Sequence, residues 1–197
     1  MKRVVSVASV VVVAVAVVSA QQSKPAAPAG KPTSVSMVAT GPITTSIKTQ
    51  FDEVKDYVLR SAQMVSDKEY EFRPQGIASD VRNYGQILGH IANVNYAYCG
   101  ASMGLDSPPE QGPKGENFEK VATKVEMQKA LMGSFAYCDK AFNMTNDHNG
   151  GDVAKAFGNQ TTRLGALAGN NGHLMEHYGN LVTYLRAMGK VPPSSQR

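Results

Sequence analysis

Three histidines have the type and spacing of metal ligands. His173 and His177 are four residues apart in a segment whose apolar residues recur with helical spacing, so both imidazoles would project from one side of a helix. Two imidazoles placed in this way can bind one ion, as in the H-E-x-x-H motif. His90 lies in the middle of a second such segment, and facing helices are where bundles build metal sites. We therefore predict a divalent metal site formed by these three residues, whereas His148, in a polar loop, is expected at the surface.

Three imidazoles would leave open positions on the ion, which is a property of catalytic metal sites rather than of structural ones. Glu176 is the candidate general base beside them. Residues 173–177 read HLMEH and match the H-x-x-E-H motif of the inverted zincins. That class of protease needs a further acidic ligand downstream, and none of the residues after His177 is Asp or Glu, so a protease is disfavoured. The alternatives are a solvated or salt-bridged Glu176 and histidines that are ordinary core residues.

The two cysteines, Cys99 and Cys138, are predicted to form a disulfide if the chain is exported, since an even cysteine count in an oxidising compartment favours pairing. The bond would join the second and third helical segments. Cys99 follows His90 by nine residues, about 13 Å along a helix, which is too far for both to bind one ion. Free thiols and metal ligation by both cysteines are the alternatives.

The first 20 residues have the three-part pattern of a secretory signal peptide. Lys2 and Arg3 precede an apolar Val/Ala run, and the segment ends in the small residues Ser19 and Ala20. We expect cleavage after Ala20, so that the protein is secreted or periplasmic and keeps no membrane anchor. The alternative is that the run is retained as a short anchor. Residues 21–40 are rich in Pro, Ala and Ser and are predicted to form a linker.

Composition and charge restrict the classes of partner. Of the 197 residues, 42% are hydrophobic and 18% are charged, which excludes a disordered chain. The formal net charge of +4 falls by two to +2 when Lys2 and Arg3 are removed, and no basic cluster remains. Nucleic-acid binding is therefore not expected, and the expected partner is a small-molecule substrate of unknown structure. Helix faces rich in Met and Tyr could belong to the core or to a homodimer interface.

Four segments with helical spacing of apolar residues follow the linker. They span approximately residues 43–66, 80–101, 118–143 and 161–188. Asp80 is the expected N-cap of the second segment, and no segment alternates in the manner of a strand. Residues 102–117 form a long connection rich in Pro and Gly. The sequence thus predicts an all-α four-helix bundle over residues 41–195, in which a long crossover lets the second and third helices run parallel.

The histidine-bearing segments resemble motifs of the DinB/YfiT-like superfamily. Residues 84–93 (YGQILGHIAN) are similar to its second-helix motif, and residues 173–180 (HLMEHYGN) resemble the H-x-x-x-H element of its last helix. The resemblance covers residues 41–195, and residues 181–186 (LVTYLR) and 191–195 (VPPSS) are similar to a secreted bacterial branch of the superfamily. It implies an up-down-down-up bundle whose three histidines bind a divalent metal, often zinc or nickel. For some members it also implies a transferase or isomerase reaction that uses a low-molecular-weight thiol.

Three hypotheses about function follow. The first is a secreted metal-dependent enzyme, a hydrolase or a thiol-dependent transferase, with His90, His173 and His177 as ligands. The second is a non-catalytic bundle protein that binds metal or a small ligand in the same pocket. The third is a disulfide-linked bundle whose histidines are core residues.

Overall fold

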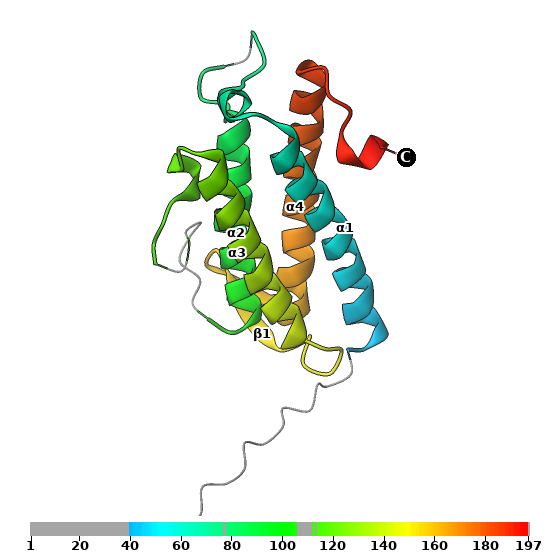
Figure 1. Cartoon of the computed structure of the whole chain (residues 1–197). Coiled ribbons are helices and arrows are strands. Elements are labelled where there is room, and N and C mark those ends of the chain that lie inside the picture. Colours follow the sequence, from blue (N-terminus) through cyan, green and yellow to red (C-terminus); the bar gives the residue numbers. More distant parts are fainter. Residues whose placement is uncertain (1–39, 77, 106–111, 113, 197) are drawn as a thin grey trace, which may run out of the picture. The chain divides into compact units, whose positions relative to one another are not determined.

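The structure is a computed structural model that describes residues 40–76, 78–105, 112 and 114–196. Four helices make up most of it, and the prediction of four helices is confirmed (Figure 1). The α-helices are α1 (Pro42–Met64), α2 (Tyr84–Ser102), α3 (Lys124–Asn143) and α4 (Arg163–Ala187). The shorter elements are the 3-10 helices η1 (Asp67–Glu71), η2 (Phe118–Lys120) and η3 (Pro193–Ser195) and the strands β1 (Val153–Ala156) and β2 (Asn159–Thr162).

The predicted signal peptide (1–20) and linker (21–40) lie outside the described residues, apart from Thr40. Within the described ranges, no helix combines the length and the apolar character needed to cross a membrane.

The strands β1 and β2 correct the expectation that the chain is entirely helical. They pair antiparallel, with Val153 opposite Thr162 and Ala156 opposite Asn159. The turn between them has positive φ at Phe157 (49°) and at the following glycine (78°), as in the two-residue turns whose twist matches a hairpin. The hairpin occupies the connection between α3 and α4.

Hydrogen bonds near the helix ends establish which ends lie together. The Tyr84 hydroxyl at the start of α2 donates to the Ser61 carbonyl near the end of α1 (2.9 Å). The Lys124 ammonium at the start of α3 donates to the Val65 carbonyl just after α1 (2.6 Å). In Figure 1 the end of α4 is found at this same end of the helices. Both α2 and α3 therefore start where α1 finishes.

The start of α1 is capped from a loop more than a hundred residues later in the chain. The Asp147 carboxylate accepts from the backbone N–H groups of Ile43 (3.1 Å) and Thr44 (2.8 Å) and from the Thr44 hydroxyl (2.8 Å). These N–H groups have no partner inside the helix, so a carboxylate stabilises them. The approach needs a glycine at Gly41, where a Cβ would lie 2.2 Å from Asp147 Cγ.

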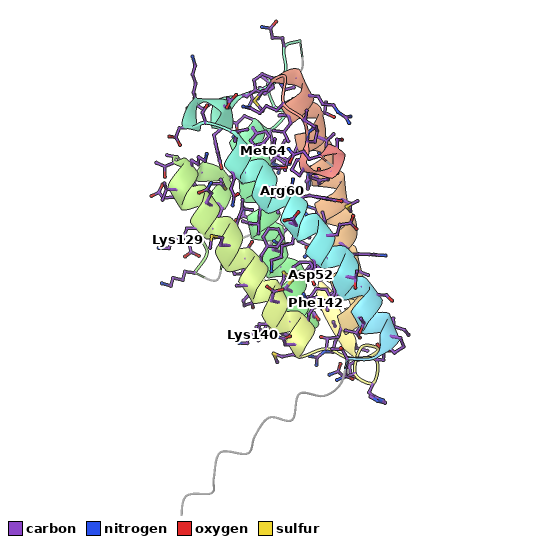
Figure 2. All side chains as sticks on the ribbon, turned by 45° about the vertical axis from the view of Figure 1, so that its right-hand side comes forward. Asp52, Arg60, Met64, Lys129, Lys140 and Phe142 are labelled. Atoms are coloured by element: carbon purple, nitrogen blue, oxygen red, sulfur yellow. A yellow bond between two sulfur atoms is a disulfide. The ribbon has the colours of Figure 1, made fainter. Side chains whose placement is uncertain are left out.

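The core lies between the four helices, with α2 as the most buried element. Sixteen of the 19 residues of α2 are buried, as expected for a helix with neighbours on most sides. Phe51 of α1 contacts Phe142 of α3, with ring centroids 5.0 Å apart. Phe142, which is labelled in Figure 2, lies near the end of α3. The largest fully buried aliphatic side chains are those of Leu88, Ile91, Leu131, Leu167, Leu174, Leu181 and Leu185. Burial of these side chains stabilises the packing of α2 against α3 and α4.

The second helix starts later than predicted, and Asp80 is not its N-cap. The Asn83 side chain accepts from the Gln86 N–H (2.8 Å), and the Gln86 side chain accepts from the Asn83 N–H (2.9 Å). This reciprocal pair is a capping box, and it starts the helix at Tyr84. The third helix likewise starts late, because residues 118–120 form the separate element η2.

A disulfide joins Cys99 of α2 to Cys138 of α3, as predicted, with Cα atoms 5.1 Å apart. Both cysteines are fully buried. Nearby, the Asn170 amide of α4 donates to Asn95 Oδ1 of α2 (3.0 Å). The disulfide and this hydrogen bond connect α2 to its two main neighbours.

Candidate metal centre

The three predicted ligands meet between α2 and α4. His90 comes from the middle of α2, and His173 and His177 come from the side of α4 that faces it. One ring nitrogen of each lies within 4.8 Å of the other two. His90 Nε2 and His173 Nε2 are 3.1 Å apart, close to the separation of about 3.4 Å between two imidazole nitrogens on a tetrahedral zinc ion. The residues that were predicted as ligands from their helical spacing therefore lie together in the structure.

Burial keeps two of these rings uncharged. It is the main reason why the pKa of His173 falls to about 3 and that of His177 to about 4. The charges of neighbouring histidines lower both pKa values further. Both imidazoles are therefore neutral at neutral pH, and a neutral imidazole has the lone pair that a metal ion needs.

The outer ring nitrogens have partners of different kinds. His90 Nδ1 lies 3.1 Å from Glu119 Oε1, and the Asn180 amide nitrogen lies 3.3 Å from His177 Nδ1. His173 Nδ1 is buried and has no hydrogen-bond partner among the described residues. A ligating histidine commonly gives its outer N–H to a carboxylate. A cluster of three imidazoles with facing nitrogens, two of them buried and one half-buried, and one such carboxylate fits a divalent metal.

Glu119 is a residue of the centre that the sequence analysis missed. It belongs to η2, which lies directly on α2: the Phe118 N–H donates to Asn93 Oδ1 (3.0 Å), and Asn93 Nδ2 donates to Asn117 Oδ1 (3.1 Å). A Cβ on Gly89 would lie 2.4 Å from the Phe118 carbonyl oxygen. The signal for this contact was present beside His90, since a small residue precedes it and an amide follows it three residues later.

A cavity of about 210 Å³ lies beside the histidines. Its walls include His177 and Asn180 of α4 and Arg82, Ile87 and Tyr184. Pockets for drug-sized ligands measure about 300–1,000 Å³. The space next to His177 is therefore suited to a small molecule or to one end of a larger one.

Aromatic rings lie near His173, which does not line this cavity. The Tyr98 ring, two turns after His90 on α2, has its centroid 6.3 Å from that of His173. Phe157, at the turn of the hairpin, packs edge-to-face on Tyr98 at 4.9 Å. The hairpin that the sequence analysis missed thus contributes an apolar side chain near the centre.

The remaining candidates have different positions. Glu176 is exposed on α4, and its charge opposes the effect of burial on the pKa of His177. Its role as a general base stays a prediction. His148 is exposed, as expected.

Fold and site together define a mostly helical protein with a three-histidine cluster between its second and fourth helices. The family model for the DinB superfamily matches residues 50–181, which include all three histidines. The chain belongs to the DinB superfamily.

Solved structures with the same fold share little sequence with this chain. A DinB-like protein from Bacillus subtilis has 19% identity and a TM-score of 0.59, and the match covers 77% of this chain and 99% of that one. A conserved protein from Enterococcus faecalis has 17% identity and a TM-score of 0.60, with 77% and 100% covered. A mycothiol-dependent maleylpyruvate isomerase has 16% identity and a TM-score of 0.56, with 73% and 63% covered. None of the curated proteins compared matches the chain.

Proposed function

We propose that this protein is a secreted metal-dependent enzyme that acts on a small molecule as a hydrolase or a thiol-dependent transferase. The observation that carries the proposal is the cluster of His90, His173 and His177, whose nitrogens lie within 4.8 Å of one another. These residues would hold zinc or nickel. When bound, such an ion would polarise a substrate oxygen.

The residues around the cluster have separate roles in this proposal. The cavity beside His177 and Asn180 binds the reacting end of the substrate. Tyr98 and Phe157 provide apolar surface on the side of His173. Glu176 accepts a proton from the nucleophile. A thiol-dependent transferase is one of the two reaction types because a structural relative is a mycothiol-dependent isomerase.

The proposal includes the arrangement and the location of the protein. The contacts between helix ends support an up-down-down-up order of α1 to α4. A buried disulfide between Cys99 and Cys138 suits an oxidising compartment such as the periplasm, in keeping with cleavage of residues 1–20. We propose that the protein binds no nucleic acid and keeps no membrane anchor after cleavage. It would be a monomer or, alternatively, a homodimer.

A non-catalytic metal- or ligand-binding protein is the alternative. It is favoured by the state of the two candidate carboxylates, since Glu119 is paired with Arg82 (2.9 Å) and Glu176 is exposed. Neither has the buried, unpaired environment that is typical of a general base.

A turnover screen separates the two functions. Metal-loaded protein would be tested against hydrolysable esters and thiol conjugates, together with the His177→Ala variant. The enzyme proposal predicts turnover that His177→Ala abolishes. Turnover by neither protein would favour the binding function, and equal turnover by both would place the reaction elsewhere.

A further inference from the structure

The connection between α2 and α3 places the carboxylate of Glu119 beside His90. Glu119 Oε1 lies 3.1 Å from His90 Nδ1, on the nitrogen that does not face His173. The two side chains are 29 residues apart in sequence. Both are largely enclosed, with the Glu119 side chain 21% exposed and that of His90 8%.

We propose that Glu119 is a positioning residue of the metal centre, which fixes the His90 tautomer whose Nε2 faces the metal, and that Arg82 holds Glu119 in place. The inference rests on the proposed function, because it assumes that the histidines bind a metal.

The chemistry of the two groups sets the direction of the hydrogen bond. A carboxylate only accepts hydrogen bonds, so His90 Nδ1 must carry the proton. In a neutral imidazole the other nitrogen, Nε2, then has the lone pair. His90 Nε2 is the atom that lies 3.1 Å from His173 Nε2. Glu119 therefore keeps a lone pair directed into the cluster and increases the basicity of the ligand.

Arg82 fixes the carboxylate through two bonds. Its Nε donates to Oε2 (2.9 Å) and its Nη2 donates to Oε1 (3.3 Å), the oxygen that also faces His90. The Arg82 backbone is held in turn, since its carbonyl accepts from the Tyr184 hydroxyl of α4 (2.9 Å). A forked contact of this kind restricts the orientation of the carboxylate.

The backbone of η2 is fixed independently of the ion pair. Asn117 Oδ1 accepts from the Glu119 N–H (3.0 Å), and Asn93 of α2 bonds both Asn117 and the Phe118 N–H. These three hydrogen bonds and the two from Arg82 thus direct one carboxylate toward one imidazole. A surface ion pair between Glu119 and Arg82 alone would not require them.

The experiment uses the protein as the cell exports it, with Zn²⁺ affinity measured by competition with a chromophoric chelator and Co²⁺ absorption spectra as a second readout. Glu119→Ala should lower Zn²⁺ affinity about 10–100-fold and change the Co²⁺ spectrum. Glu119→Gln should bind more tightly than Glu119→Ala, because the amide oxygen still accepts from Nδ1–H although the ion pair is lost. The matched control is Asp139→Ala, which removes a carboxylate paired with Lys55 (2.5 Å) away from the histidines and should leave both readouts unchanged.

Nitrogen-15 NMR of the Zn²⁺-loaded wild type tests the tautomer without any substitution. The inference predicts a proton on His90 Nδ1 and metal at Nε2, and the reverse assignment would overturn it. Three affinity results would overturn it as well. They are Zn²⁺ binding by Glu119→Ala that is as tight as in wild type, binding by Glu119→Gln that is as weak as in Glu119→Ala, and a loss of Zn²⁺ affinity in Asp139→Ala as large as in Glu119→Ala. A wild type that binds no Zn²⁺ would overturn the proposed function and this inference together, whereas the other outcomes overturn the inference alone.

Discussion

At the scale of single residues, Gly89 allows η2 to approach α2 closely beside His90. A Cβ at this position would lie 2.4 Å from the Phe118 carbonyl oxygen and 2.6 Å from the Glu119 nitrogen. Both are backbone atoms, so they cannot move without displacing η2. Gly89→Ala is therefore expected to weaken Zn²⁺ binding and to lower the melting temperature, as measured by chelator competition and circular dichroism.

Gly172, next to His173 on α4, provides the matched control. An added Cβ there has no neighbour within 4 Å. Gly172→Ala should raise the free energy of unfolding by about 0.5–1 kcal/mol, since alanine loses less conformational entropy in a helix, and should leave Zn²⁺ affinity unchanged. If Gly89→Ala binds Zn²⁺ as tightly as Gly172→Ala does, the contact with η2 does not position the centre.

The three histidines could be predicted from the sequence and Glu119 could not. His173 and His177 depend only on helical period, and His90 on a facing apolar segment. The position of Glu119 depends on a contact between η2 and Gly89 across a connection that has no periodicity. Gly89 and Asn93 mark α2 as the place of a close contact, but they do not show which later segment makes it, because tertiary packing decides that.

At the scale of elements, the start of α1 depends on the charge of Asp147. Hydrogen bonds from the backbone of Thr44 and of Ile43 lower the pKa of this carboxyl below its ordinary value of 3.8. The cap therefore stabilises the fold fully above pH 3.8, and this contribution is lost as the pH falls from there through the lowered pKa. Asp147→Asn should unfold at a lower urea concentration than wild type at neutral pH. The difference between the two urea midpoints should become smaller in acid.

The control for this prediction is Asp52→Asn, which removes an exposed pair with Lys48 within α1 and should have a much smaller effect. A difference between Asp147→Asn and wild type that is as large in acid as at neutral pH would mean that the charge of the carboxylate does not stabilise α1.

The disulfide between α2 and α3 is the other element-scale prediction. Cys99 and Cys138 are 39 residues apart, and closing a loop of that length stabilises a fold by about 4 kcal/mol on the chain-entropy model. The double variant Cys99→Ala/Cys138→Ala should unfold at a correspondingly lower urea concentration and keep its helical circular dichroism. Equal urea midpoints for the double variant and wild type would show that the cross-link does not stabilise the fold by restricting the conformational entropy of the unfolded chain.

The hairpin and the first residues of α2 and α3 could not be predicted from the sequence. β1 and β2 have four residues each, too few for alternation to stand out, and Phe157 is not a residue typical of positive φ. The N-cap of α2 was placed at Asp80, because both Asp80 and Asn83 are suitable caps and only the reciprocal bond with Gln86 decides between them. The four helices themselves were predictable from period and length.

At the scale of the whole molecule, the proposed export of the protein is tested by the fate of residues 1–20. Expression in a bacterial host with the native N-terminus should give periplasmic protein that begins at Gln21, as shown by N-terminal sequencing and intact mass. Ala20→Phe should block processing, since small residues are required at the cleavage site. Membrane-bound wild type that keeps residues 1–20 would contradict export as a free protein.

The metal content of the purified protein shows most plainly whether it is a metalloprotein. Protein purified without added chelator would be analysed by inductively coupled plasma mass spectrometry, alongside His173→Ala and the exposed-site control His148→Ala. We expect about one divalent ion per chain in wild type and in His148→Ala, and a large loss in His173→Ala, because three convergent imidazoles are needed to hold the ion. Equally little metal in wild type and His173→Ala would contradict it.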